Sequence, residues 1–180
     1  MIHRRPKQFS LPDYHHSIFY EIGIIQKYIA AGWIALPVRA GTRHQVDILP
    51  EKKGILERHS RWDSLLTSRH AEDLLGLFDK RCTVWGVVLR LSSKSFAQFA
   101  IHDLVALDGK ILHEMSFQER RDRFPVLTTS ERVTIIKPLV CPIEIGKAIA
   151  QKTTCGLQLI APYEPGFRFR VWVHPQAEAK

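Results

Sequence analysis

Short apolar or alternating segments, separated by turn residues, are the feature of this sequence that most constrains its fold. Alternation of apolar and polar residues is typical of half-buried strands, and residues such as Gly, Pro and Asp favour the turns between them. Strands are expected at residues 33–37, 44–49, 54–58, 83–91, 95–104, 133–136, 156–161 and 167–173. Strands and helices do not alternate regularly along the chain. The sequence therefore predicts an α+β fold with antiparallel sheets flanked by helices.

Apolar residues at helical spacing predict the helices. Helices are expected at residues 17–31, 71–79, 116–123 and 142–152. In the first, isoleucines recur at steps of three and four residues, at Ile18, Ile22 and Ile25, which is the spacing of one helix face. The third begins with a capping-box pattern, in which Ser116 is followed three residues later by Glu119.

Length and composition limit the organisation of the chain. With 180 residues, the chain is long enough for one ordinary domain, which we expect at residues 17–180 behind a basic arm at residues 1–16. No apolar run approaches the ~18 residues of a membrane span, and no apolar segment of a secretory signal follows the basic start. We therefore expect a cytoplasmic protein with no membrane contact.

The cysteine pattern indicates neither a disulfide framework nor a metal site. The chain has three cysteines, Cys82, Cys141 and Cys155, and none of them belongs to a Cys-x-x-Cys pair or stands at ligand spacing from a histidine. Free thiols and no bound metal are the expectation.

Positive charge is the first indication of a partner. The formal net charge is +8 and the isoelectric point is about 9.6, an excess that favours binding to polyanions. The cations also cluster along the chain, for example at residues 39–44, 58–61 and 120–123. Nucleic acid is the polyanion that this pattern favours.

Two adjacent segments resemble a block of the ATP-dependent DNA ligases. Residues 98–109 read QFAIHDLVALDG and end in Asp108-Gly109, a dipeptide that favours a tight turn. Residues 117–121 read FQERR. In the ligase family, a strand ending in aromatic-Asp-Leu runs into a Leu-Asp-Gly turn and then into a Glu-Arg-Arg helix. The resemblance implies the nucleotidyltransferase fold of the ligase adenylation domain.

Other blocks of the ligases have counterparts in the same order along residues 33–175. The nucleophile block, Lys-x-Asp-Gly-x-Arg, corresponds to residues 38–43, and its following Ser-Arg corresponds to Ser60 and Arg61. The Asp-Gly-Glu block corresponds to residues 85–87. Residues 155–160 and 162–166 resemble the Glu-Gly-hydrophobic strand and the Pro-Tyr-x-Pro-Gly turn of the family. No counterpart of the OB-fold domain of the ligases is expected within this chain.

The resemblance also implies that the catalytic groups have been replaced. Ligases use a lysine amine to attack the α-phosphate of ATP, and the position of that lysine is occupied here by Val38. The remaining changes remove carboxylates, an aromatic ring and two lysines that contact nucleotide or metal in the family. The implied degenerate nucleotide pocket consists of Val38, Ala40, Val87, His102, Cys155, Trp172 and His174. The resemblance thus implies a ligase-like pseudoenzyme with no catalytic residue and no cofactor.

Several arginines remain at positions that could contact phosphates. The candidate nucleic-acid-binding residues are Arg39, Arg43, Arg58, Arg61, Arg120 and Arg121. Because arginine forks bind phosphate oxygens, we expect these residues to bind nucleic acid. The resemblance to the DNA ligases implies a non-catalytic protein that binds DNA in preference to RNA. Binding at nicks or ends, as an accessory in repair or replication, would be consistent with this ancestry.

Two alternatives follow from the same residues. The fold could serve as a protein-interaction subunit, with Trp62, Trp85 or Trp172 contributing to a partner surface. Alternatively, a different alignment of the motifs would make the chain an active ATP-dependent nucleotidyltransferase.

Overall fold

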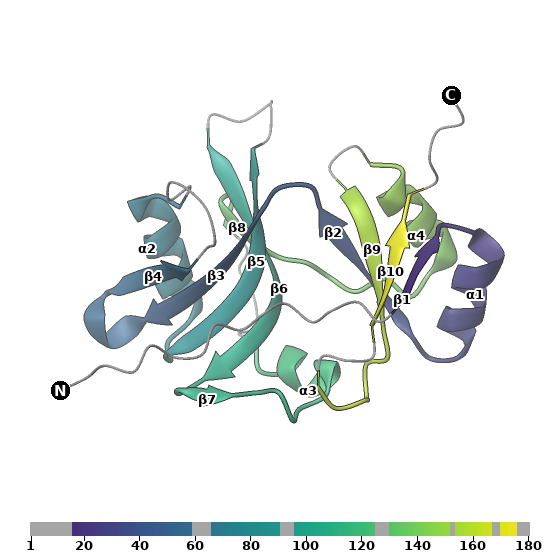
Figure 1. The fold of residues 1–180 in the computed structure, drawn as a ribbon. Helices are drawn as coiled ribbons and strands as arrows, with labels where there is room; N and C mark the ends of the chain where they lie inside the picture. The colour runs from purple at the N-terminus through teal and green to yellow at the C-terminus, as the bar shows by residue number, and fades with distance from the viewer. Residues whose placement is uncertain are drawn as a thin grey trace.

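Two β-sheets lie side by side in the protein, each with helices against its outer side (Figure 1). The computed structural model describes residues 16–58, 66–90, 96–124, 130–151, 154–166 and 170–175, without the side chains of residues 16, 58 and 90. Residues 1–15 of the expected basic arm lie outside this range. Among the described residues, no helix has the length and apolar character needed to cross a membrane.

The larger sheet has the strand order β4-β3-β5-β6-β7, and β8 pairs in parallel with β6. Its strands are β3 (Thr42–Leu49), β4 (Gly54–Arg58), β5 (Cys82–Arg90), β6 (Ala97–Leu107), β7 (Lys110–Ile111) and β8 (Val133–Ile135). The 3-10 turn η1 (Pro50–Lys52) connects β3 to β4. A core of aliphatic and aromatic residues fills the space between this sheet and α2 (Ser68–Leu77).

The smaller sheet has four strands in the order β1-β10-β9-β2. These are β1 (His16–Phe19), β2 (Ile34–Arg39), β9 (Thr154–Ile160) and β10 (Arg170–His174). The helices α1 (Ile22–Ala30) and α4 (Pro142–Ile149) cover its outer face, and a second core fills the space beneath them. The predicted mixture of antiparallel sheets and few helices is confirmed, although β1–β10 and β6–β8 are parallel pairs.

A third core joins the two sheets. It combines Ile34, Leu36 and Ile160 of the smaller sheet with Val87, Leu89 and Ala100 of the larger sheet. Side chains alternate along a strand, so β2 sends every second residue into this shared core and the others towards α4. The shared core therefore fixes the inner faces of both sheets, where four of the seven candidate pocket residues lie.

The first predicted helix is only partly correct. Residues 17–19 belong to β1, in which Ile18 pairs with Val173 of β10, and the helix begins at Ile22. Residues 17–19 pair in parallel with β10, and this long-range pairing overrides the helical spacing of the local sequence. The helix ends as expected, before Gly32 at φ = 83°.

The predicted turn and cap around α3 (Phe117–Arg121) are confirmed. Asp108 and Gly109 both have positive φ, 49° and 76°, as a tight turn between β6 and β7 requires. The Ser116 hydroxyl accepts a hydrogen bond from the Glu119 amide at 3.3 Å, and the Glu119 carboxylate accepts one from the Ser116 amide at 2.7 Å. This reciprocal cap holds α3 below the two sheets (Figure 1).

Candidate functional site

Val38 lies at the end of β2 and faces the space between the sheets. Its side chain is 1% exposed, and it follows Ile34 and Leu36 on the face of β2 that belongs to the shared core. Its partner across the antiparallel pair is Gly156 of β9. The resemblance assigns the nucleophilic lysine to this position, and the Val38 side chain found there points inward and is buried from solvent.

Trp172 fills the space next to Val38. A Cβ atom placed on Gly156 would lie only 2.5 Å from Cζ2 of Trp172, so the indole ring occupies the place of a side chain at residue 156. Residues directly opposite in an antiparallel pair have their side chains on the same face, which puts the ring beside Val38. The indole Nε1 donates a hydrogen bond to Nδ1 of His174 at 3.1 Å, which fixes the ring in this position.

The larger sheet contributes Val87 and His102, both fully buried. His102 lies at a β-bulge, because Trp85 pairs with Asp103 while the next residue of β5, Gly86, pairs with Ile101. Its imidazole contacts the Trp85 ring, with 4.7 Å between the ring centroids. Among the described residues, neither ring nitrogen of His102 has a hydrogen-bond partner.

Burial keeps the His102 imidazole neutral. The pKa of His102 is lowered from 6.5 to about 3, mainly because burial removes the solvation of the charged form. Asp103 acts in the opposite direction, and the cations Arg170, Arg43 and Arg39 contribute to the lowering. A neutral imidazole between apolar and aromatic neighbours cannot act as a proton donor near neutral pH. The His102 side chain packs in the interior, at the position that the resemblance assigns to an aromatic ring of the ligases.

The other three residues of the predicted pocket, Ala40, Cys155 and His174, are exposed. The Cys155 thiol lies 3.5 Å from the Val38 carbonyl oxygen, and partial burial raises its pKa even though Arg43 is nearby. Within the part of the chain that the structure describes, no cluster of three His, Cys, Asp or Glu residues could hold a metal ion. The four inward-facing positions carry valine, valine, histidine and tryptophan, and none of these is a carboxylate or an amine.

Two of the predicted nucleic-acid-binding arginines lie together at the turn between β2 and β3. Arg43 is exposed at the start of β3, and Arg39 is partly buried at the end of β2. Arg39 Nη1 donates a hydrogen bond to Gln151 Oε1 at 2.8 Å. The Arg58 side chain and all of Arg61 lie outside the described residues.

Arg120 cannot contact a nucleic acid, and that prediction is wrong. Its side chain is 0% exposed, and it donates two hydrogen bonds of 3.0 Å to the two carboxylate oxygens of Asp103. Arg170 donates a further hydrogen bond to Asp103 Oδ2 at 2.7 Å. The sequence contained a signal for this burial, because Arg120 stands three residues after the buried Phe117 on the same face of α3.

Arg121 is separated from the other candidate arginines. Its guanidinium lies between the rings of Phe117 and Phe124, at 5.9 and 5.0 Å from their centroids, and burial lowers its pKa. In Figure 1, α3 lies at the opposite end of the molecule from the turn between β2 and β3. Arg121 therefore does not share a surface with Arg39 and Arg43.

Two of the three tryptophans predicted for a protein-interaction surface are buried. Trp85 and Trp172 are only 6% and 9% exposed, so their rings belong to the interior. Trp62 lies outside the described residues.

Comparison with models of known protein families finds no match, and comparison with curated proteins finds none either. Among solved structures, the protein is similar to the ligase domain of LigD from M. tuberculosis, with a TM-score of 0.51 and 19% identity, over 87% of this chain and 57% of that one. Mycobacterial DNA ligase D complexed with ATP and MES gives a TM-score of 0.49 and 18% identity, over 79% of this chain and 54% of that one.

This chain spans a little over half the length of both structures. At this level of identity, the similarity concerns the fold and not the activity. The protein has a mixed α/β fold that resembles the adenylation domain of a DNA ligase.

Proposed function

We propose that this protein is a non-catalytic member of the DNA ligase fold that binds nucleic acid, with DNA preferred over RNA and nicks or ends as the candidate sites. The observation that carries the proposal is the closed packing around Val38, which is 1% exposed beside Gly156 and the Trp172 ring. An aliphatic side chain has no lone pair with which to attack an α-phosphate. The neighbouring Trp172 ring is packed against the same part of β9, so the surroundings of Val38 are filled by side chains.

The charge of the protein supports the binding part of the proposal. A net charge of +8 attracts a phosphate backbone, and Arg39 and Arg43 put two guanidinium groups on the β2–β3 turn. Contacts of this kind position a protein on a duplex without reading its bases. Arg120 is left out of the proposed interface because Asp103 holds it inside the protein.

Salt-dependent binding to labelled DNA tests this proposal. Fluorescence anisotropy with nicked, intact and single-stranded DNA, at about 50 and about 300 mM salt, should show affinity that falls steeply with salt. Arg43→Gln should weaken binding to all three. One lost phosphate contact should reduce the slope of log K against log salt by about 0.9 for the duplex probes and by about 0.7 for single-stranded DNA. Lys52→Gln, which removes one exposed charge from η1, is the matched control for net charge.

Binding that is absent, or equal at both salt concentrations, would contradict the nucleic-acid proposal. The non-catalytic part is tested separately by incubating the protein with α-labelled ATP and magnesium or manganese, followed by denaturing electrophoresis. We expect no labelled protein. A covalent nucleotide adduct would overturn the assignment of Val38 to the nucleophile position and would favour an active nucleotidyltransferase.

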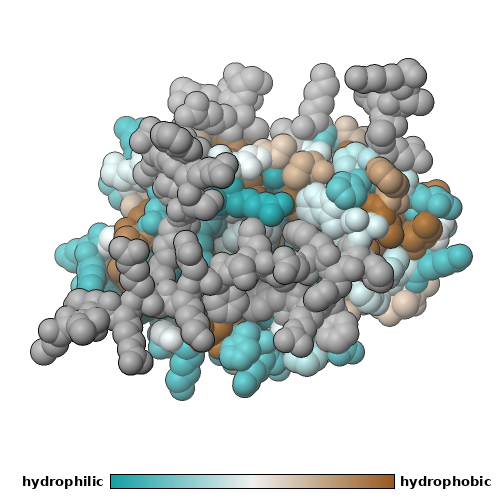
Figure 2. All heavy atoms as spheres, in the orientation of Figure 1, coloured by the Kyte–Doolittle hydropathy of each residue, from teal (hydrophilic) through white to brown (hydrophobic). Residues whose placement is uncertain are grey.

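One observation favours the second candidate function, a protein-interaction subunit. Large apolar side chains are exposed near α1 and α4, at Phe19 (67%), Val140 (61%) and Ile143 (70%). Figure 2 shows apolar side chains gathered over the α1 end of the visible face. Co-purification of a partner that survives nuclease treatment and is lost in Ile143→Asp, together with no affinity for DNA, would support this candidate over the first.

A further inference from the structure

Acidic residues are nearly absent from the segments that build the smaller sheet. No aspartate or glutamate occurs in residues 22–46, which contain α1, β2 and the start of β3, or in residues 145–163, which contain most of α4 and all of β9. Residues 132–143 contain none either, and Glu144 follows them. Acids do occur on most elements of the larger sheet, for example on β3, β4 and β6. The positive charge of the acid-poor segments is therefore not offset within them.

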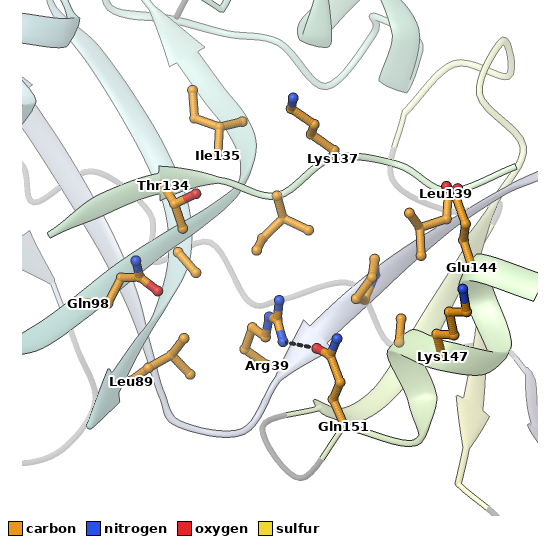
Figure 3. Close-up of a pocket in the computed structure, with 14 residues that line it drawn as sticks. Arg39, Leu89, Gln98, Thr134, Ile135, Lys137, Leu139, Glu144, Lys147 and Gln151 are labelled. Carbon is orange, nitrogen blue, oxygen red and sulfur yellow. Dashed lines mark hydrogen bonds between the residues drawn. The ribbon is translucent and has the colours of Figure 1, made fainter. Parts of the chain in front are cut away.

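The three acid-poor segments meet at a cavity of about 680 Å³. It is bounded by β2 and α4 of the smaller sheet and by β5, β6 and β8 of the larger sheet (Figure 3). Lys137 borders the cavity from the connector that follows β8, and Lys147 borders it from α4. These two lysines come from different elements and lie around the same cavity.

Both lysines are exposed, and neither forms an ion pair with another residue that the structure describes. Glu144 is the one carboxylate among the described lining residues, and it precedes Lys147 by three positions on α4 without pairing with it. A lysine ammonium group has three N–H donors on a flexible chain, and it binds phosphate oxygens as a point charge. Two such groups at one cavity are suited to contacts with a polyanion.

Arg43 extends this cationic region to the larger sheet. It is exposed at the start of β3, and its charge is close enough to the Cys155 thiol to counteract the rise of that thiol's pKa. Cys155 follows Thr154, whose amide donates a hydrogen bond of 2.9 Å to the Gln151 carbonyl oxygen just after α4. A series of neighbouring groups therefore leads from Arg43 over the start of β9 to the helix that carries Lys147.

We propose that Arg43, Lys147 and Lys137 form a cationic band that binds the phosphate backbone of the nucleic acid, so that a strand runs from the β2–β3 turn across the cavity to the connector after β8. This inference rests on the proposed function and adds to it the place where the nucleic acid lies. A nucleic acid offers a phosphate at every nucleotide, so cations on three elements can each contact a different one. A folded acidic protein would need carboxylates placed to match all three positions.

The double variant Lys137→Gln/Lys147→Gln tests the position of the backbone. In anisotropy titrations of a labelled intact duplex, its slope of log K against log salt should be smaller than that of the wild type by about 1.8, because each lost phosphate contact removes about 0.9. The control Lys52→Gln/Lys80→Gln removes the same charge from η1 and from the turn between α2 and β5, and its slope should be unchanged. Lys137→Arg/Lys147→Arg, which keeps both charges, should retain the wild-type slope.

The outcomes separate this inference from the proposed function. Wild-type protein that binds no DNA would overturn both. Salt-dependent binding by the wild type, with the same slope in Lys137→Gln/Lys147→Gln, would overturn only the cationic band. An equal decrease of the slope in the control variant would also overturn it, because the effect would then come from net charge. A Lys137→Gln/Lys147→Gln variant that loses affinity for labelled poly-glutamate and keeps its affinity for DNA would assign the band to an acidic protein instead. Circular dichroism establishes that each variant is folded.

Discussion

His102 places an imidazole inside the protein with no hydrogen bond to either nitrogen from the described residues. A buried polar group without partners costs free energy that the surrounding packing has to offset. In this position the ring contacts Trp85, and its burial lowers its pKa to about 3. The free-energy cost of burying this neutral ring increases as the pH falls below 6.5, because the imidazole of the unfolded chain is then protonated.

His102 should therefore make the free energy of unfolding depend on pH. Its folded-state pKa of about 3 lies below its unfolded value of 6.5, so between these values the unfolded chain binds more protons. Its contribution to stability is complete above pH 6.5 and is lost as the pH falls towards 3, with a slope of up to ~1.4 kcal/mol per pH unit. Urea unfolding at about pH 7.5 and about pH 5 measures this difference.

The control is His102→Phe, which keeps a ring in the same place. This variant should be less sensitive to the same change of pH, because it has no group there that titrates. An equal loss of stability in both proteins between the two pH values would show that His102 is not the source.

Asp103 holds two arginines from distant parts of the chain, Arg120 of α3 and Arg170 of β10. Asp103→Asn should lower the free energy of unfolding by ~3–5 kcal/mol, because it removes the negative charge that both buried guanidinium groups contact. Urea denaturation followed by circular dichroism measures the change. Asp122→Asn, at the exposed end of α3, removes the same charge and should cost ~1 kcal/mol or less. Similar losses in both variants would contradict a structural role for Asp103.

At the scale of elements, local patterns predicted most of the strands of the larger sheet. The alternation near residues 44–49 and the valine-rich segment at 83–91 correspond to β3 and β5, and the alternating segment that follows corresponds to β6. The short-range signals at α3 were sufficient because a capping box and an Asp-Gly turn depend on neighbours in sequence.

What depends on distant partners could not be predicted in this way. β1 exists because it pairs with β10, more than 150 residues along the chain, and its own residues favour a helix. The burial of Arg120 requires Asp103 of β6 to lie against α3, and no local sequence pattern indicates this contact.

Close approach of β5 to β6 depends on Gly86. A Cβ atom there would lie 2.5 Å from the Ala100 carbonyl oxygen and 2.7 Å from a ring carbon of Phe99, both too close for contact. Gly86→Ala should therefore destabilise the protein by ~1–3 kcal/mol or more, because the strands have to separate to admit the methyl group. Thermal unfolding measures this change.

Gly76→Ala in α2 is the matched control. A Cβ atom at residue 76 would have no heavy atom within 4 Å outside its own helix surroundings, so the methyl group meets open space. This substitution should stabilise the protein by ~0.5–1 kcal/mol, since alanine favours the helix more than glycine does. A loss of stability at residue 76 as large as at residue 86 would contradict the steric explanation.

At the scale of the molecule, the shared core should make the two sheets unfold together. Cys82 reports on the larger sheet: it is 2% exposed, and burial raises its thiol pKa to about 12. We expect Cys82 to react with iodoacetamide only when the protein unfolds, at the same urea concentration as the loss of circular dichroism. Cys155, which is exposed, should react in the folded protein. Mass spectrometry of tryptic peptides measures the labelling of each of the two thiols separately. Labelling of Cys82 at a lower urea concentration than the loss of circular dichroism would instead show that the larger sheet opens first.

Alternation along β2 assigns neighbouring residues to different compartments. Val38 packs in the interior between the sheets, while the side chain of Arg39, one residue later, reaches Gln151 just beyond α4. A substitution at residue 38 therefore changes the packing between the sheets and leaves the charge at residue 39 untouched, and the reverse also holds. The two faces of such an edge strand can change independently, because a single substitution affects only one of them.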